Sequence, residues 1–174
     1  MALTKVNTGG LALDAVDNTI LKLDDNYALT GTVSGAGKIL QVLTATDSTE
    51  RTTSSNSYVT ASNTLAVAIT PSATSSKIYI TCSFSYGSPN GTYGFLPTIY
   101  RGSTNIGGST GRFGNLFSSH DYNYSHATLN VLDAPSSTSA ITYQLYFLSA
   151  TNTCRINNGG GGSFSTITAF EIGA

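Results

Sequence analysis

The sequence predicts an all-β protein in which about ten antiparallel strands form a sandwich or jelly roll. Two observations lead to this fold class. Only 10% of the residues are charged, against roughly a quarter in an average domain, and Ser, Thr, Gly and Asn fill the polar positions. Short β-like runs also alternate with turn clusters at the spacing of a sandwich, and no segment of helical period interrupts them. Without crossover helices, neighbouring strands are expected to pair antiparallel.

The expected strands begin at residue 38. In chain order they cover 38–46, 56–62, 64–70, 77–87, 94–102, 112–117, 126–133, 140–150, 153–157 and 163–173. The breaks between them contain the glycines and prolines that end strands. The final run follows four consecutive glycines, so we predict a loop there and a buried last strand that ties down the terminus.

The two cysteines are predicted to be reduced thiols. Cys82 lies in the run 77–87, in line with Ile78, Ile80 and Phe84 at period two. This pattern favours a small buried hydrophobe over a disulfide or a metal ligand, and we expect the same of Cys154. A bridge between the two is the alternative interpretation.

Residues 1–37 differ from the remainder of the chain. Their apolar residues keep no lasting period, and the segment is too apolar for an ordinary disordered tail. We predict an extended arm that docks on a neighbouring protein, with a short helix over 12–23 as the alternative. The stretch 31–37 (GTVSGAG) indicates a hinge, so the chain divides into an arm with its hinge, 1–37, and a head, 38–174. The predicted anchor residues of the arm are Leu11, Leu13, Val16, Ile20, Leu21 and Leu23.

Two expected strands are apolar on both faces. In 141–148, Tyr146 and Leu148 lie opposite a first apolar row, and in 164–172, Ile167 and Ala169 lie opposite a row containing Phe170. A sheet with one solvated face should alternate cleanly between apolar and polar residues. We therefore predict that Tyr146, Leu148, Ile167 and Ala169 form the interface of a homo-oligomer.

A resemblance to a known family is carried by GKILQVLTATDSTERTTSSNSYVT, LAVAITPSATSSKIYI, IYRGSTNIGG, DAPSSTSAITYQLYF and STITAFEIGA. These stretches resemble jelly-roll domains of virion surface proteins of tailed bacteriophages, especially phages of marine and cyanobacterial hosts. Residues 3–31 resemble an arm found in phage fibre proteins. The resemblance is densest at 38–81 and 133–174. It implies a tumour-necrosis-factor-like jelly roll that forms a homotrimer around a threefold axis.

The sequence contains no motif that predicts catalysis or the binding of a phosphate, cofactor or metal. GAGK at 35–38 lacks the earlier glycine and the following Ser or Thr of a phosphate loop. The acidic residues form no credible catalytic pair, and we expect no enzyme activity, no cofactor and no metal site. A net charge of −1 provides no field for nucleic acid, and no apolar run is long enough for membrane insertion.

The most unusual polar stretch is FSSHDYNYSH at 117–126. Its tyrosines and histidines predict at most a recognition patch for a sugar ring or a partner protein, because Tyr offers a large contact area at a small entropic cost. A surface loop without a function is the competing interpretation. The patch comprises His120, Tyr122, Tyr124 and His126.

The expected function is therefore structural. Fibre proteins with such a head commonly carry a long shaft, and only the arm precedes the head here. This favours a homotrimeric decoration or cement protein on the virion surface, made in the cytoplasm of the bacterial host. Its arm would bind neighbouring virion proteins, the major capsid protein foremost. The alternative is the receptor-binding head of a tail fibre, which would attach to a host surface glycan or protein.

Overall fold

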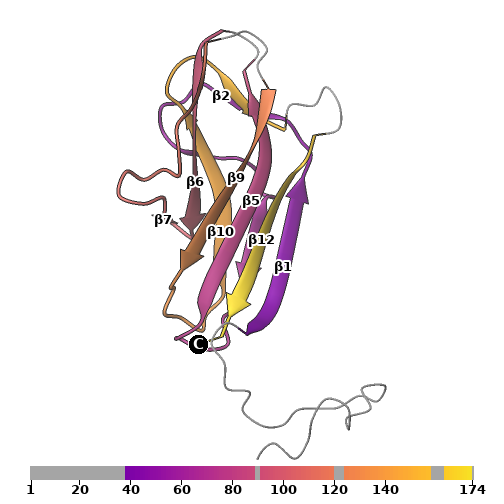
Figure 1. Cartoon of the computed structure of the whole chain (residues 1–174), viewed down its shortest axis with the longest axis vertical. Coiled ribbons are helices and arrows are strands. Elements are labelled where there is room, and N and C mark those ends of the chain that lie inside the picture. Colours follow the sequence, from indigo (N-terminus) through magenta and orange to yellow (C-terminus); the bar gives the residue numbers. More distant parts are fainter. Residues whose placement is uncertain (1–37, 89–90, 120–123, 158–162, 174) are drawn as a thin grey trace, which may run out of the picture. The chain divides into compact units, whose positions relative to one another are not determined.

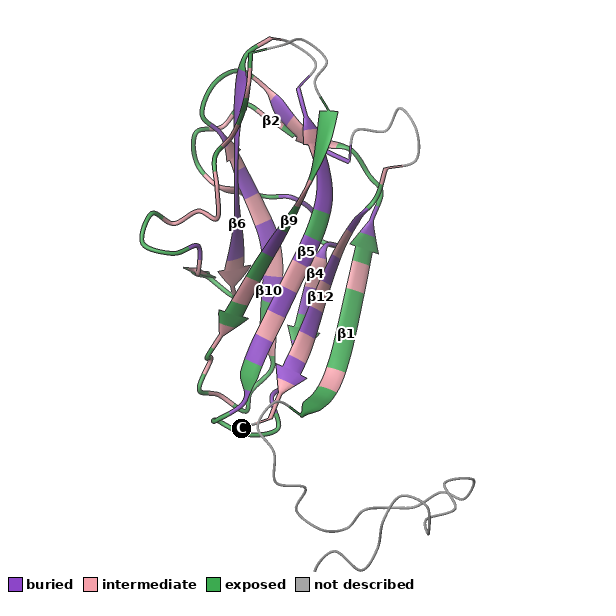
Figure 2. Cartoon of the chain, in the orientation of Figure 1, coloured by how far each residue is buried: buried purple, intermediate pink, exposed green. Residues whose placement is uncertain are grey.

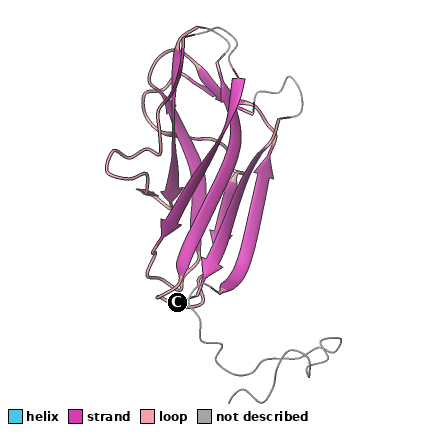
Figure 3. Cartoon of the chain, viewed as in Figure 1, coloured by secondary structure: helices cyan, strands magenta, loops and turns pink. Residues whose placement is uncertain are grey.

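The computed structural model describes residues 38–88, 91–119, 124–157 and 163–173, which form a β-sandwich without helices (Figures 1 and 3). The strands of this described part are β1 (Ile39–Asp47), β2 (Arg51–Thr53), β3 (Val59–Thr60), β4 (Ala66–Ile69), β5 (Lys77–Gly87), β6 (Tyr93–Arg101), β7 (Thr104–Asn105), β8 (Leu116–Ser118), β9 (Tyr124–Asp133), β10 (Ile141–Ser149), β11 (Cys154–Ile156) and β12 (Ser165–Ile172).

The strands form two antiparallel sheets. Sheet A has the order β1-β12-β5-β11-β2, with β9 also paired to β5, and sheet B has the order β3-β10-β6-β7, with β4 on β10 and β8 on β6. When the eight principal strands β1, β4, β5, β6, β8, β9, β10 and β12 are numbered along the chain, sheet A follows 1-8-3-6 and sheet B follows 2-7-4-5. This interlocking order, in which most connections cross between the sheets, is that of a jelly roll.

The predicted fold class is confirmed, and a strand lies in each of the ten predicted runs. β5 has the predicted bounds, and the short strands β2 and β7 were not predicted. β12 lies between β1 and β5 in sheet A (Figure 1), so the last strand is held by hydrogen bonds on both sides. The helix considered for 12–23, the arm and its hinge at 31–37 lie outside the described residues.

The core fills the space between the inward faces of the two sheets. Phe95 of sheet B stacks on Phe84 of sheet A and on Phe147 of its own sheet, with ring centroids 5.6 Å and 5.1 Å apart. Cys82 and Cys154 are free and buried, and Cys82 lies in the core row where the sequence placed it. Burial raises the pKa of both thiols, that of Cys154 to about 11, so both are protonated and unreactive near neutral pH.

One carboxylate is buried at the edge of this core. Glu171 of β12 accepts hydrogen bonds from the backbone nitrogen and hydroxyl of Ser72 (both 2.6 Å), from Ser76 Oγ (2.7 Å) and from Gln41 Nε2 (2.6 Å). Burial alone would raise the pKa of Glu171, but these donors outweigh it and lower the pKa from 4.5 to about 2. The ionised carboxylate therefore ties β12 to β1 and to the β4–β5 connection.

Candidate functional site

The outward face of sheet A carries a continuous row of large apolar side chains. Cross-strand register aligns Val42 of β1 with Phe170 of β12, Phe170 with Tyr79 of β5, and Tyr79 with Leu132 of β9. Val42 is 51% exposed and Leu132 is 59% exposed, and the rings of Phe170 and Tyr79 lie 6.1 Å apart. Ile39 and Ile172 form the adjacent pair at the end of the same face. We call these six residues the apolar band.

The rows beside the band on β1, β5, β9 and β12 are mostly polar and uncharged. The next row contains Thr44, Thr168, Thr81 and Asn130, and the Oγ1 atoms of Thr44 and Thr168 lie 3.1 Å apart. The row beyond it contains Thr46, Thr166, Ser83 and Thr128. Among the described outward residues of β1, β5, β9 and β12, Lys77 is the one Lys, Arg, Asp or Glu.

The outward face of sheet B is covered by the chain itself. The segment 102–115 crosses it, because Thr98 Oγ1 donates to Asn105 Oδ1 (2.6 Å) and the Phe113 nitrogen donates to the Pro97 carbonyl (3.1 Å). Leu96 and Thr98, which point outward, are consequently only 4% and 0% exposed. Gly107 makes this approach possible, since a Cβ there would overlap Thr98 Oγ1 and lie 2.7 Å from the Arg112 nitrogen.

Aromatic side chains complete the cover of sheet B. The Tyr146 ring stacks on Tyr100 at 4.1 Å between centroids, and Tyr58 meets Tyr100 edge-on at 6.2 Å. At the other end of the sheet, Phe117 occupies the space left by Gly94, where a Cβ would lie 2.5 Å from the ring. Tyr146 and Leu148 therefore point outward, as predicted, but are half-buried within one chain.

The predicted interface residues do not share a surface. Ile167 and Ala169 are fully buried in the core, where they align with Cys82 and Ile80. The facing assigned to this strand was wrong, because both of its rows are apolar and periodicity cannot distinguish them; Phe170 and Ile172 point outward instead. β10 and β12 also belong to different sheets, so their outward faces point in opposite directions. Figure 2 shows the alternation of burial along β5, β10 and β12 and the exposure of β1.

The other predicted residues fall into two groups. Tyr124 and His126 are exposed on β9, and they align with Gly87 and Ser85 on the outward face of sheet A. His120 and Tyr122 lie outside the described residues, and so do all six arm residues: Leu11, Leu13, Val16, Ile20, Leu21 and Leu23. The apolar band was missed because its residues come from four strands, and only the register places them in one row.

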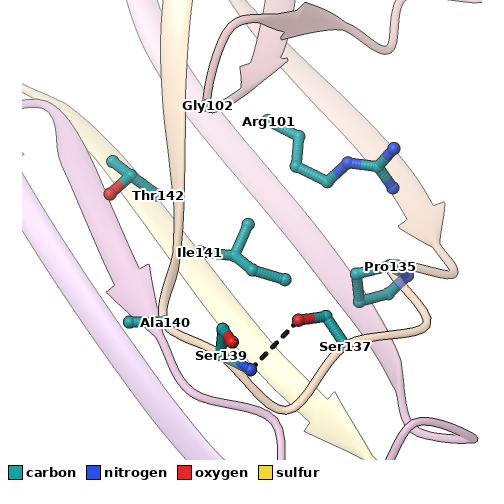
Figure 4. Close-up of a pocket in the computed structure, with 8 residues that line it drawn as sticks. All are labelled: Arg101, Gly102, Pro135, Ser137, Ser139, Ala140, Ile141 and Thr142. Atoms are coloured by element: carbon teal, nitrogen blue, oxygen red, sulfur yellow. Dashed lines mark hydrogen bonds between the residues drawn. The ribbon is translucent and has the colours of Figure 1, made fainter.

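A hollow beside the β6–β7 turn offers no chemistry (Figure 4). It has a volume of about 410 Å³ and is lined by Arg101, Gly102, Pro135, Ser137, Ser139, Ala140, Ile141 and Thr142. Arg101 Nη1 donates to both oxygens of Asp133, at 3.0 and 3.1 Å, and Tyr143 Oη donates to Asp133 Oδ2 at 2.6 Å. Burial and the bond to Asp133 raise the pKa of Tyr143, so it remains a donor. This cluster joins the two sheets.

The described part of the chain contains neither a cluster of metal-ligand side chains nor a helix that could cross a membrane. No group of three or more His, Cys, Asp or Glu is placed to hold an ion there. Within the same residues, no helix has the length and apolar character needed to span a bilayer.

Comparison with known proteins yields structural likeness only. No protein-family model matches the chain, and no curated protein matches it. Among solved structures, the D431N mutant VP2 protein of infectious bursal disease virus, in derived T=1 particles, has a TM-score of 0.43 and 12% identity, covering 87% of this chain and 40% of that one. A second structure of T=1 particles derived from this virus gives 0.43 and 13%, covering 88% and 40%. At these values the likeness carries no argument about function.

Proposed function

We propose that this chain is a structural protein of a tailed-phage virion, acting as a homotrimeric decoration or cement protein. The resemblance of its strand sequences to phage surface proteins supports this assignment. So does the jelly-roll order of its strands, a fold that recurs in viral capsid domains. Because a fold does not define a function, the proposal depends on one surface, the outward face of sheet A.

The apolar band is the observation that carries the proposal. Sheet B is covered by its own chain, whereas sheet A exposes Val42, Leu132 and Ile39 beside two aromatic rings. Large exposed apolar patches mark interaction sites. We assign this patch to further copies of the same chain, because residues near a symmetry axis meet their own copies and like charges would repel there. The described outward residues of β1, β5, β9 and β12 include one Lys, Arg, Asp or Glu, which is Lys77, and this part of the face fits that requirement.

The proposed mechanism of stabilisation is mass action. A protein that binds the assembled shell and not its dissociated subunits stabilises the shell in proportion to occupancy and affinity. The arm, 1–37, would supply the contact with neighbouring virion proteins, above all the major capsid protein. Its proposed anchors are the apolar residues between Leu11 and Leu23. In this role the protein has no catalytic activity and resides on the virion surface after synthesis in the host cytoplasm.

A decoration assay tests this role. The full chain and a variant lacking residues 2–34 are each added to undecorated particles, and bound protein is measured after sedimentation. We expect the full chain to bind and to raise the temperature at which particles release their genome. The truncated chain should form the same trimer but should not bind. Equal binding by the truncated chain would place the anchor in the jelly roll and contradict the cement mechanism.

One observation favours the alternative, a receptor-binding head of a tail fibre. Tyr124 and His126 are exposed together at the start of β9, where they could contact a host glycan or protein. A cryo-electron map of the virion separates the two functions. Density for this trimer on the capsid shell supports decoration, and density at a fibre tip supports receptor binding.

A further inference from the structure

Two long strands form the free edges of sheet A. Among the described strands, β1 pairs with β12 alone and β9 pairs with β5 alone, and Figure 1 shows β1 and β9 on opposite sides of this sheet. One side of each backbone therefore has no neighbouring strand with which to share ladder hydrogen bonds. β1 has nine residues and β9 has ten, so each edge is long enough for a further strand to pair with it.

Neither edge has the features that usually prevent the addition of a strand. Native proteins protect an edge with lysines, prolines, bulges or very short strands. Residues 39–46 and 124–132 contain no Lys, Arg, Asp, Glu or Pro. The register of β9 with β5 is uninterrupted, and that of β1 with β12 has one irregularity, between Ile39 and Gln41. Both edges are therefore open to pairing with another strand.

β1 is also apolar on both of its faces. Val42 belongs to the outward apolar band, whereas Leu43 points inward, where it aligns with the buried Ala169. Val42 is 51% exposed and Leu43 is 37% exposed. An inward residue can be exposed to this extent because no strand lies beyond β1. A strand added at this edge would therefore cover side chains on both faces, which favours pairing.

The residues of β1 match those of β9 row by row. β1 and β9 run in opposite directions, because three antiparallel pairings separate them within the sheet. A neighbouring copy in the same orientation can therefore place its β9 antiparallel to β1, with Leu132 opposite Val42. The apolar band and the polar rows beside it would then continue from one copy to the next. The further pairs are Thr44–Asn130 and Thr46–Thr128 on the outward face, and Leu43–Val131 and Ala45–Leu129 on the inward face.

We propose that β1 of one copy pairs with β9 of the next, so that sheet A continues from subunit to subunit. The inference rests on the proposed function, since it requires a homotrimer, and it adds which strands meet. A cyclic trimer needs a contact between two different surfaces of the chain, because a surface that meets itself gives a twofold dimer. Pairing β1 with β1, or β9 with β9, would leave the other edge open. The β1–β9 contact covers both edges of every copy in the ring.

Disulfide cross-linking of the double variant Val42→Cys/Leu132→Cys tests this pairing. Residues directly opposite in an antiparallel pair have Cα atoms about 4.5–5.5 Å apart, within the range of about 4.4–6.8 Å that a disulfide bridges. Within one chain, three strand spacings of about 14 Å in total separate the two positions, so a bridge must join two subunits. We expect mild oxidation to give a covalent trimer on non-reducing gels. The native cysteines are buried and should not contribute.

Two variants serve as matched controls. Thr46→Cys/Leu132→Cys uses the same strands four residues out of register, about 14 Å along β1, and should give no covalent trimer. Val42→Cys alone should not cross-link, because the pairing sets Val42 opposite Leu132 and not opposite a second Val42. Light scattering before oxidation checks that each variant is the same trimer as the wild type.

Hydrogen exchange of the wild type gives a measurement that needs no cysteine variant. Alternate amides of 39–46 and 124–132 lie on the unpaired side of their strands, and each would gain a hydrogen bond in the trimer. They should exchange about tenfold more slowly, or slower still, than in Phe170→Glu, which we expect to be a monomer, because the added bond must open before exchange.

The pairing is overturned if the trimeric double variant gives no covalent trimer, if Val42→Cys alone cross-links as fully, or if these amides exchange equally fast in the trimer and the monomer. In each of these cases the trimer remains, and the proposed function with it. A monomeric wild type would overturn both the pairing and the proposed function.

Discussion

The two sheets of this sandwich differ in how far the chain itself covers their outward faces. On sheet B, the segment 102–115 is hydrogen-bonded to Pro97 and Thr98, and the ring of Tyr100 packs against those of Tyr58 and Tyr146. On sheet A, no described segment lies over the apolar band, and Val42 and Leu132 are more than half exposed. The same fold thus has one face covered by its own chain and one face left open.

The difference shows why exposure is a better guide to an interface than apolar character. Tyr146 and Leu148 are as apolar as the residues of the band, and the sequence placed them in the interface. Both are half-buried within one chain, and the Tyr146 ring already stacks on Tyr100, so a partner would remove less of their surface from water. Phe170 and Tyr79 are half-buried as well, but their row ends in Val42 and Leu132, which are 51% and 59% exposed. Burial by another molecule would therefore gain more free energy at sheet A.

The largest expected effect comes from a substitution in the inward row of β12. Ile167 is fully buried between the sheets, so Ile167→Asp would bury an unpaired charge and should lower the free energy of unfolding by about 3–5 kcal/mol or prevent folding. Urea denaturation followed by circular dichroism measures this loss. A fully stable Ile167→Asp protein would show that Ile167 faces outward, as the sequence first indicated.

Acid should loosen the edge of sheet A. The pKa of Glu171 is depressed in the folded state, so its contribution is complete above 4.5, the pKa expected in the unfolded chain, and is lost as the pH falls towards about 2. The contribution has an upper bound of about 3 kcal/mol, from 1.36 kcal/mol per unit of pKa shift. Thermal melts between pH 6 and pH 2, at roughly constant ionic strength, should show this fall in the wild type and a flatter profile in Glu171→Gln. Identical slopes in the two proteins would contradict this role.

A smaller effect is expected from displacing the segment 102–115 from the outward face of sheet B. Gly107→Ala places a methyl group against Thr98 Oγ1 and the Arg112 backbone, and relief of that overlap requires the loop to move. We expect a loss of about 1–3 kcal/mol, as for an overpacked site. Hydrogen exchange should show faster exchange of the Phe113 amide, which donates to Pro97. Gly102→Ala is a useful comparison, because it has a positive φ but no atom within 4 Å of the added methyl.

The sequence predicted the strands well and their surroundings less well. Each of the ten predicted runs contains a strand, because alternating apolar residues between turn clusters are a local signal. The strands β2 and β7 have three and two residues, too few for a period to appear. The facing of β12 was wrong because Ile167 and Phe170 both suit a core. The Gly- and Ser-rich loop contains two large apolar residues, Ile106 and Phe113, and both pack against the core. These two residues were the signal in the sequence that the loop lies on the sandwich.

The oligomeric state tests the central claim most directly. We expect size-exclusion chromatography with multi-angle light scattering to give a homotrimer for the wild type. Phe170→Glu places a charge in the middle of the apolar band and should yield a folded monomer, whereas Tyr146→Glu, on the outward face of sheet B, should remain a trimer. A wild-type monomer would contradict the account. A trimer that survives Phe170→Glu but dissociates with Tyr146→Glu would move the interface to sheet B.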